Sequence, residues 1–323
     1  MAEITQENGA WHFDGEEIRI VPGSGRGTHP LRAALGEVTV PLAAVAGVSF
    51  EPGRKAGRRT GPGGRLRLRM RPGADPFTQA TAGRLPEAAD PYLLEVDRGG
   101  AAVAEYLAAE VRDARLLEQV PDGPADRYLL PGPPVPLVLK GSDGTLLFDG
   151  ELLRLEWGWA AEESKKSAGV RTMPFTELAG VEWALAQGFE NGFLRLLTRG
   201  PQVRVKPAHD PYCVVLWGLR SARETAQVAV MAAALTARLP HPFEPARGAA
   251  AESAAEPPAA LPGAPAPAPV PASAPGPAAA AAAAPEDHDA LLRRLRELGE
   301  LHAAGILTEE EFRAAKKAVL DRF

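Results

Sequence analysis

The chain has 323 residues and a formal net charge of −5 at pH 7, from 36 lysines and arginines against 41 aspartates and glutamates. Affinity for nucleic acid comes mainly from neutralising phosphates, so this acidic balance argues against specific nucleic-acid binding. The one cysteine, Cys213, excludes an intrachain disulfide and a metal site built from several cysteines.

The first eight residues are polar and acidic, without the basic and apolar regions of a secretion signal. No run of about 18 apolar residues occurs in the chain, so no transmembrane segment is predicted. An alanine run at 278–284 is too short for one and lies between Pro277 and Pro285. We therefore expect a cytoplasmic protein.

Residues 10–118 predict several short strands followed by one helix. Ile18 and Ile20 alternate with polar residues, as in a half-buried strand. The glycines of 23–27 form a loop, but no helical pattern follows them as a dinucleotide-binding turn requires. From residue 101 to 117 the apolar spacing becomes helical. Further strands are predicted at 38–40, 45–50, 66–70 and 92–96, and the helical stripe is Val103, Tyr106, Leu107, Val111 and Ala114.

Residues 119–142 are rich in proline and predict a short, stiff connector. Residues 143–240 again predict strands followed by one helix, with a charged loop at 162–166. Ser221 and Glu224 have the spacing of a capping box at the start of this helix. The fold class is therefore α+β, mainly β. The strands are predicted at 152–159, 169–175, 178–183, 192–198, 202–206 and 212–216, and the helical stripe is Val228, Met231, Leu235 and Leu239.

The two β-rich segments carry the same landmarks in the same order, which identifies them as two copies of one domain. An internal repeat determines the architecture of the whole chain and therefore takes precedence over the assignment of single elements. The interval between matched landmarks shrinks along the chain because copy one has the longer loops. The matched pairs are 13–16 with 148–151, Pro41 with Pro174, 47–48 with 180–181, 66–68 with 194–196 and 90–92 with 210–212.

The C-terminal part divides into a linker and a helical hairpin. Residues 241–287 are mostly alanine and proline, cannot bury enough apolar area, and predict a disordered linker. Residues 288–323 predict two helices separated by Gly305, with a capping box from Thr308 to Glu311. A unit of this size rarely folds alone, so its apolar face must pack against something. That face is Leu292, Leu295, Leu298, Ile306, Phe312, Val319, Leu320 and Phe323.

Two family resemblances follow from these motifs. The tail has Gly-Ile-Leu-Thr-x-x-Glu-Phe at 305–312 followed by lysines, and it resembles the SHOCT (short C-terminal) domain. The tandem copies resemble a bacterial domain of unknown function that occurs in pairs, through Ala-Gly-Val-Glu-Trp at 179–183 and Asn-Gly-Phe-Leu-Arg-Leu at 191–196. This resemblance implies a PH-like antiparallel barrel closed by a C-terminal helix in each copy. Copy one departs from the pattern, with Phe50 in place of the tryptophan. If copy one has lost a shared binding role, copy two should keep it.

The sequence offers little for catalysis. No Gly-x-Ser-x-Gly elbow positions a nucleophile, and Cys213 lies in an apolar strand, where a buried inert thiol is expected. The repeated Asp-Pro-Tyr is explained by a turn that enters a strand. We expect no catalytic, cofactor-binding or metal-binding residues and no enzyme. The histidines, of which no two share an element at metal-ligand spacing, are His12, His29, His209, His241, His288 and His302.

A basic cluster in copy one is the feature with the clearest functional alternative. Its strand should turn Leu66, Leu68 and Met70 inward and its arginines outward. A solvated strand face explains this pattern. The alternative is an anionic surface, such as lipid headgroups or a polyanion, to which each basic group contributes about 1 kcal/mol. The candidate residues are Arg54, Lys55, Arg58, Arg59, Arg65, Arg67, Arg69 and Arg71.

These observations favour a non-enzymatic scaffold with a tethered C-terminal hairpin. The hairpin is expected to mediate self-association or to bind a protein partner, and the long linker raises its effective concentration. The alternative is an adaptor that binds an anionic membrane surface or polyanion weakly through the basic face of copy one. An enzyme or small-ligand binder using a barrel mouth is a third interpretation.

Overall fold

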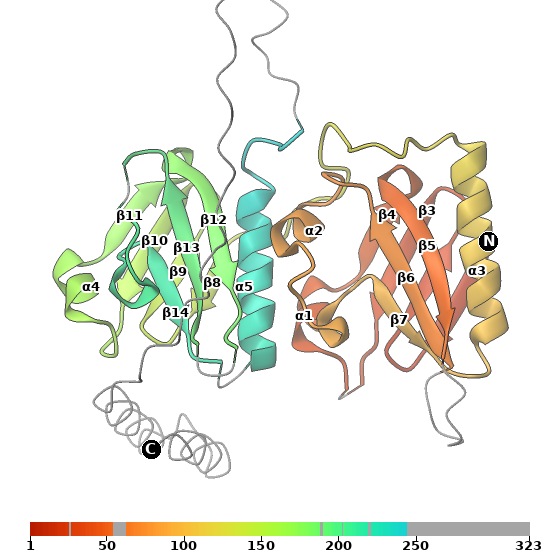
Figure 1. The fold of residues 1–323 in the computed structure, drawn as a ribbon, viewed down its shortest axis with the longest axis horizontal. Helices are drawn as coiled ribbons and strands as arrows, with labels where there is room; N and C mark the ends of the chain where they lie inside the picture. Colours follow the sequence, from red (N-terminus) through yellow and green to blue (C-terminus); the bar gives the residue numbers. More distant parts are fainter. Residues whose placement is uncertain (26, 54–62, 188–189, 202, 219–220, 244–323) are drawn as a thin grey trace, which may run out of the picture. The chain divides into compact units, whose positions relative to one another are not determined.

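The computed structural model describes residues 1–243 except 26, 54–62, 188–189, 202 and 219–220 (Figure 1). Both copies belong to one compact unit, Met1–Pro245. Residues 244–287 of the predicted linker and the whole C-terminal hairpin, including every residue of its apolar face, lie outside the described residues. Residues 241–243, predicted as the start of the linker, are described, and the His241 ring lies within hydrogen-bonding distance of the carbonyl oxygen of Gly73, at 2.8 Å.

Copy one has two antiparallel sheets and a closing helix. The first sheet has the order β1-β2-β3-β4 and the second the order β5-β6-β7. The closing helix, α3 (Ala101–Leu117), packs against β1 and β5. The other elements are β1 (Ala2–Gln6), β2 (Gly9–Phe13), β3 (Glu17–Pro22), α1 (Pro30–Leu35), β4 (Val38–Pro41), β5 (Val45–Pro52), β6 (Gly64–Met70), α2 (Pro76–Thr81) and β7 (Leu93–Val96).

Copy two repeats this arrangement. Its sheets have the orders β11-β10-β9-β8 and β12-β13-β14, and its closing helix, α5 (Ser221–Thr236), packs against β8 and β12. The predicted α+β class, mainly β, is confirmed. The PH-like barrel implied by the resemblance stays a prediction. The other elements are β8 (Leu137–Lys140), β9 (Gly144–Phe148), β10 (Leu152–Trp157), α4 (Glu163–Ala168), β11 (Arg171–Pro174), β12 (Leu178–Ala184), β13 (Gly192–Thr198) and β14 (Cys213–Leu216).

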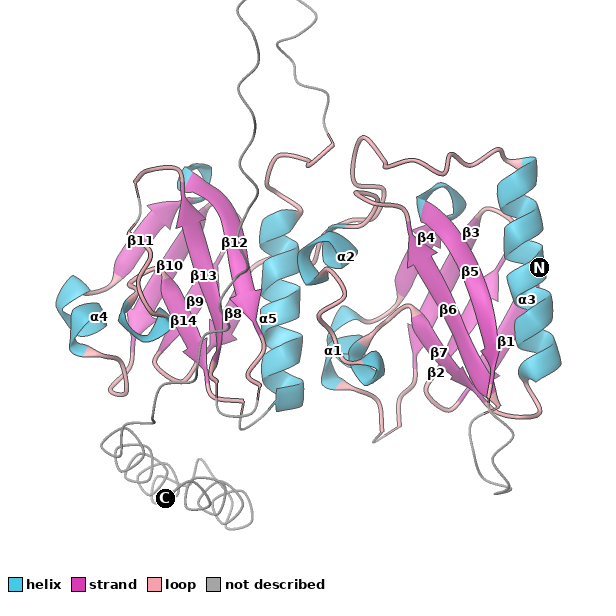
Figure 2. Cartoon of the chain, viewed as in Figure 1, coloured by secondary structure: helices cyan, strands magenta, loops and turns pink. Residues whose placement is uncertain are grey.

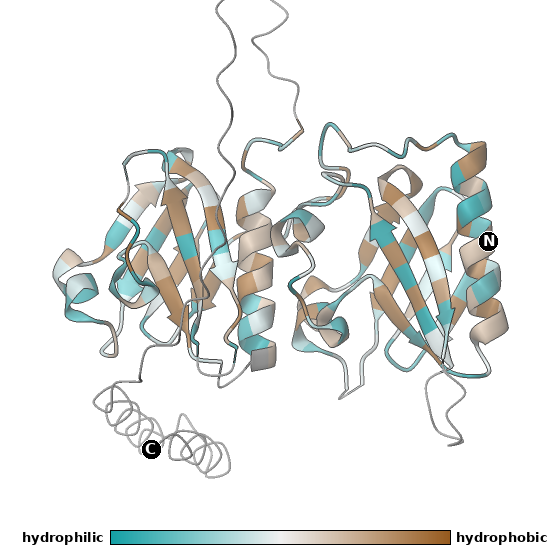
Figure 3. Ribbon diagram, viewed as in Figure 1, coloured by the Kyte–Doolittle hydropathy of each residue, from teal (hydrophilic) through white to brown (hydrophobic). Residues whose placement is uncertain are grey.

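Local sequence explains the repeated β-hairpins. In β6, Leu66 and Leu68 are buried while Arg65 and Arg69 are exposed, and Figure 3 shows this alternation along the strand. The turns before β3 and β10 each use an Asp-Gly pair. The carboxylate of Asp149 accepts hydrogen bonds from the backbone N–H groups of Leu152 and Glu151, at 2.7 and 2.9 Å. These bonds hold the pKa of Asp149 below its usual value.

The structure differs from the sequence prediction in several elements. The first strand of each copy lies outside the predicted bounds, because β1 precedes residue 10 and β8 falls within the proline-rich connector. The segment 203–206, predicted as part of a strand, is not one. The charged segment 162–166, predicted as a loop, enters the short helix α4.

The predicted apolar stripe of the first closing helix is partly wrong. The inward face of α3 consists of Ala104, Leu107, Ala108 and Val111. Val103 and Tyr106 lie outside it, with 42% and 54% of their surface exposed. Sequence spacing alone does not distinguish these two phases, because small alanines replace larger side chains at the contact with the sheet.

The two copies are joined through the second closing helix. Besides the strands of copy two, α5 packs against α1 and α2 of copy one, as Figure 2 shows. Nearby, the indole N–H of Trp183 in β12 donates a hydrogen bond of 2.9 Å to the carbonyl oxygen of Ala80 in α2. The guanidinium of Arg84 lies 5.7 Å from the centre of the Trp183 ring. Trp183, which stands where copy one has Phe50, is therefore a contact residue between the copies.

This contact predicts the effect of replacing Trp183. Trp183→Phe should lower the free energy of unfolding by about 1–3 kcal/mol, because it removes the donor to a buried carbonyl and leaves unfilled volume. Urea denaturation measures the difference. The matched control is Trp159→Phe at a side chain that is 56% exposed, which should change stability by less than about 0.5 kcal/mol. Equal effects from the two variants would contradict the assigned role.

Candidate functional site

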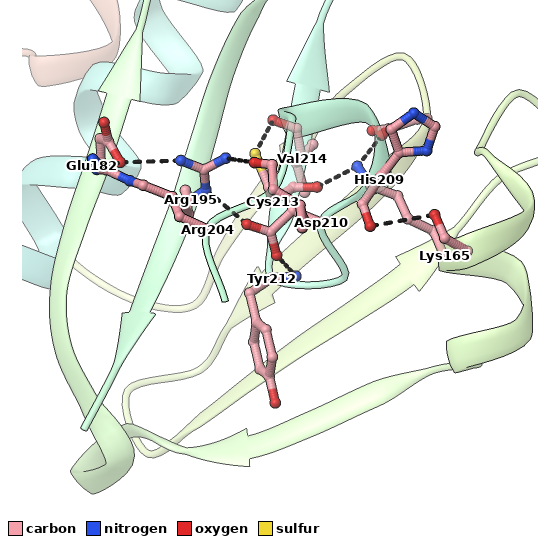
Figure 4. Close-up of polar contacts among 12 residues, drawn as sticks. Lys165, Glu182, Arg195, Arg204, His209, Asp210, Tyr212, Cys213 and Val214 are labelled. Carbon is pink, nitrogen blue, oxygen red and sulfur yellow. Dashed lines mark hydrogen bonds and ion pairs between the residues drawn. The ribbon is translucent and has the colours of Figure 1, made fainter. Parts of the chain in front are cut away.

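The repeated Asp-Pro-Tyr motif forms the same hydrogen-bonded turn in both copies, with its ion pair buried in copy two and half-buried in copy one. One carboxylate oxygen of Asp210 accepts the backbone N–H of Tyr212 at 2.9 Å, and the other accepts Nε of Arg195 at 2.7 Å (Figure 4). In copy one, Asp90 accepts the backbone N–H of Tyr92 at 2.9 Å and Nη1 of Arg67 at 3.5 Å. The motif is thus a strand-entry turn, as predicted, combined with an ion pair to the neighbouring strand.

Copy two extends this ion pair into a network. Arg195 also donates to Glu182 at 3.2 Å and to the carbonyl oxygen of Val205 at 2.7 Å. Glu182 in turn accepts from Arg204 at 2.6 Å. With Asp210, the network has two guanidinium and two carboxylate groups and so carries no net charge. Such balanced groups neutralise each other and offer little attraction to an outside ion.

A second buried pair in copy two joins Lys165 of α4 to Asp143. The Lys165 ammonium contacts the Asp143 carboxylate, donates to the carbonyl oxygen of Cys213 at 2.6 Å, and lies 4.8 Å from the centre of the Trp157 ring. The second carboxylate oxygen of Asp143 accepts the backbone N–H of Val215 at 2.9 Å. Both charges are therefore compensated within the protein, which is what burial of an ion pair requires.

Copy one has the same design with different side chains. Arg32 of α1 donates to the carbonyl oxygen of Leu93 at 2.9 Å, and Leu93 occupies the position of Cys213. Asn8, in place of Asp143, bridges the backbone N–H and C=O of Glu95 at 3.0 and 3.2 Å. In each copy, a basic side chain of a short helix thus donates a hydrogen bond to the carbonyl oxygen of the first residue of the last strand.

The Cys213 thiol is buried in β14. Burial raises its pKa to about 12, although the nearby Lys165 and Arg195 act in the opposite direction. At neutral pH the group is therefore a thiol and not the thiolate that attacks electrophiles or binds metals.

Only part of the predicted basic cluster is an exposed and unpaired basic surface. Arg65 pairs with Glu87 at 3.0 Å, and Arg67 pairs with Glu87 at 3.3 Å and with Asp90 at 3.5 Å. Arg69 is exposed and has no ion pair among the described residues. Glu51 and Glu95 lie directly across from Arg65 on the neighbouring strands. Four of the candidates, Arg54, Lys55, Arg58 and Arg59, lie outside the described residues.

The prediction that Arg71 faces outward is wrong. Its guanidinium is buried and donates to the carbonyl oxygens of Ala43, Gly123 and Pro124, at 2.8, 2.9 and 3.2 Å. The alternation of β6 ends at Met70, so Arg71 no longer follows it. Through these hydrogen bonds, Arg71 instead links the connector between the copies, residues 119–142, to copy one.

The glycine loop that follows β3 borders an open hollow of about 430 Å³. The described side chains around it include the carboxylates Glu7, Glu95 and Asp97 and no lysine or arginine. The described carboxylates around this hollow would repel a phosphate.

Among the described residues, no group of three or more histidine, cysteine, aspartate or glutamate side chains is arranged to hold a metal ion. In the same part of the chain, no helix is long and apolar enough to cross a membrane.

The tandem arrangement agrees with comparison to known families. A family model described as Domain of unknown function (DUF4429) matches residues 11–112 and 146–236, more than half of the chain. The chain belongs to the DUF4429 family. A Short C-terminal domain (SHOCT) model matches residues 293–320. Both resemblances drawn from the sequence motifs are confirmed, and a search of curated proteins found no match.

Sequence reasoning missed the buried cations of this DUF4429 protein. The sequence predicts a charged loop at Lys165 and a turn at Asp143. A usable signal was present, since Arg32 and Lys165 are separated by the same interval as Pro41 and Pro174. A positive charge at matching positions in two copies is typical of a structural role.

The buried pair predicts a large loss of stability on partial removal. Lys165→Met should lower the free energy of unfolding by about 3–5 kcal/mol, because it leaves the Asp143 carboxylate buried without a cation. Adding Asp143→Asn should recover part of the loss, since the amide of Asn8 fills this position in copy one. Urea denaturation tests both. Lys166→Met, at an exposed neighbour, is the control, and the account fails if it costs as much as Lys165→Met.

Proposed function

We propose that this DUF4429 protein is a non-enzymatic scaffold whose C-terminal SHOCT hairpin joins it to a second copy of the chain. The proposal rests on the apolar residues of segment 288–323, which the sequence predicts to form a hairpin too short to fold alone. The match of this segment to a separate family model supports treating it as a unit of its own.

The body supports a structural role for the two copies. In copy two, the clustered charged side chains contact one another: Arg195 with Asp210 and Glu182, and Lys165 with Asp143. In copy one, Arg71 is held by three backbone carbonyls. Groups held in this way stabilise a rigid fold, which suits a body that presents a tethered contact segment.

The described part of the basic cluster does not favour the adaptor alternative. Of the four described candidates for an anionic surface, Arg71 is buried and Arg65 and Arg67 have carboxylate partners. Surface pairs of this kind are weak, but they reduce the net positive charge that attracts a headgroup. We therefore do not propose a membrane-surface role.

Light scattering tests the proposed self-association. The full chain should have the mass of an oligomer, and a truncation ending at Pro245 should have the mass of a monomer. In the full chain, Leu320→Lys should give a monomer because it places a charge on the apolar stripe. Asp321→Lys, on the opposite face of the predicted helix, should leave the oligomer intact. Monomers from both the full chain and the truncation would contradict self-association.

A further inference from the structure

Two buried N–H groups of copy two have no hydrogen-bond partner among the described residues: Nε of Arg171 and the indole Nε1 of Trp157. Both lie where α4 connects β10 to β11, since Trp157 is the last residue of β10 and Arg171 is the first residue of β11. Arg171 pairs directly with Leu155, two positions before Trp157. The two side chains are therefore diagonal neighbours on the inner face of the sheet.

This pair of donors favours a bound acceptor. A buried N–H group that is left unsatisfied is destabilising, so buried donors of folded proteins nearly always have a partner. The other two unpartnered N–H groups of the described residues, on Trp11 and Arg115, lie singly on β2 and α3 of copy one. Of the four, only those of copy two lie on adjacent strands, where one acceptor can serve both.

Tyr212 adds a third donor at the same place. The Arg171 guanidinium lies 5.0 Å from the centre of the Tyr212 ring, and its Nη1 donates to the Tyr212 hydroxyl at 3.1 Å. Because the hydroxyl oxygen accepts this bond, its own proton can be donated elsewhere, and no group in the described part of the chain accepts it. Figure 4 shows the Tyr212 ring extending away from the Arg195–Asp210 pair.

The charge at this place is positive. The neighbouring cation Lys165, which lies 4.8 Å from the centre of the Trp157 ring, is neutralised by Asp143. Arg171 has no carboxylate partner among the described residues, and its Nη1 is engaged by Tyr212. The edge formed by Nε and Nη2 is therefore left for a ligand. This edge of a guanidinium binds both oxygens of a carboxylate or phosphate group in a bidentate geometry.

Copy one lacks these donors. The positions that match Arg171 and Trp157 in the repeat are Val38 and Pro22. The tyrosine is retained as Tyr92, but its hydroxyl donates to the Asp75 carboxylate at 2.8 Å. A site built from the three donors is thus confined to copy two.

We propose that copy two binds a small oxyanion, a carboxylate or a phosphate group, between β11 and the start of β14. Nε and Nη2 of Arg171 hold two of its oxygens, and the Tyr212 hydroxyl and the Trp157 indole N–H donate to it. This binding role goes beyond the scaffold function and does not depend on the C-terminal hairpin, because all three residues belong to the body.

Nuclear magnetic resonance of the ¹⁵N-labelled full chain tests the proposal. Inorganic phosphate and acetate are titrated separately at an ionic strength held constant with chloride. The indole N–H signal of Trp157, assigned from its loss in Trp157→Phe, should shift and saturate with at least one of the two anions. Arg171→Gln should weaken this binding about 10-fold or more, because it removes the charge-assisted hydrogen bonds. Saturation with phosphate alone or with acetate alone identifies which group the site takes.

The matched control is Arg154→Gln, at an exposed arginine of β10 that pairs with Glu156 at 2.8 Å, and it should bind the anion as the unmodified chain does. If Arg171→Gln does not fold, Tyr212→Phe replaces it, since this variant keeps the ring and removes the donor, and it should weaken binding several-fold. A shift that does not saturate with either anion shows an adventitious ion only and overturns the proposal. Equal affinity in the unmodified chain and in the folded Arg171 or Tyr212 variant also overturns it.

Discussion

The fold of this body depends on a helix that is buried on two sides. A closing helix ordinarily packs one stripe on its sheets and leaves the other face in water. In α5 the residues from Met231 to Leu235 are all buried, because copy two covers one face and α1 and α2 cover the other. The alanines at 232–234 allow this close approach, since larger side chains would hold the packed elements apart. Trp183 adds a hydrogen bond across the same junction.

This constraint explains why the two copies have diverged. Copy two presents an alanine-rich helix and a tryptophan to its neighbour, while copy one presents α1 and α2. Copy one has Phe50 where copy two has Trp183, and α3 carries Glu105, Glu110 and Asp113, whereas α5 buries several alanines. The two copies therefore contribute different elements to the interface between them. The tryptophan of copy two makes a contact between the copies, and whether Phe50 marks the loss of a shared binding role stays a prediction.

Much of the architecture was predictable from the sequence, and the misses have physical causes. Alternation in β6 and the Asp-Gly turns predicted strands correctly, because these signals are local. The short helices α1, α2 and α4 are not predicted from the sequence, because six residues are too few to show the 3.6-residue period of a helix. The burial of Lys165 and Arg71 depends on partners such as Asp143 and Gly123, which are distant in the sequence. The phase of α3 was wrong because its core contact uses Ala104 and Ala108.

The central claim is that α5 makes the two copies one cooperative body, and scanning calorimetry of the full chain tests it most directly. One body predicts a single transition for residues 1–243, with a calorimetric enthalpy equal to the van't Hoff enthalpy. Two separate transitions, each with the enthalpy of one copy, would contradict the claim. They would mean that the contacts of α5 and Trp183 with copy one are too weak to couple the two folds.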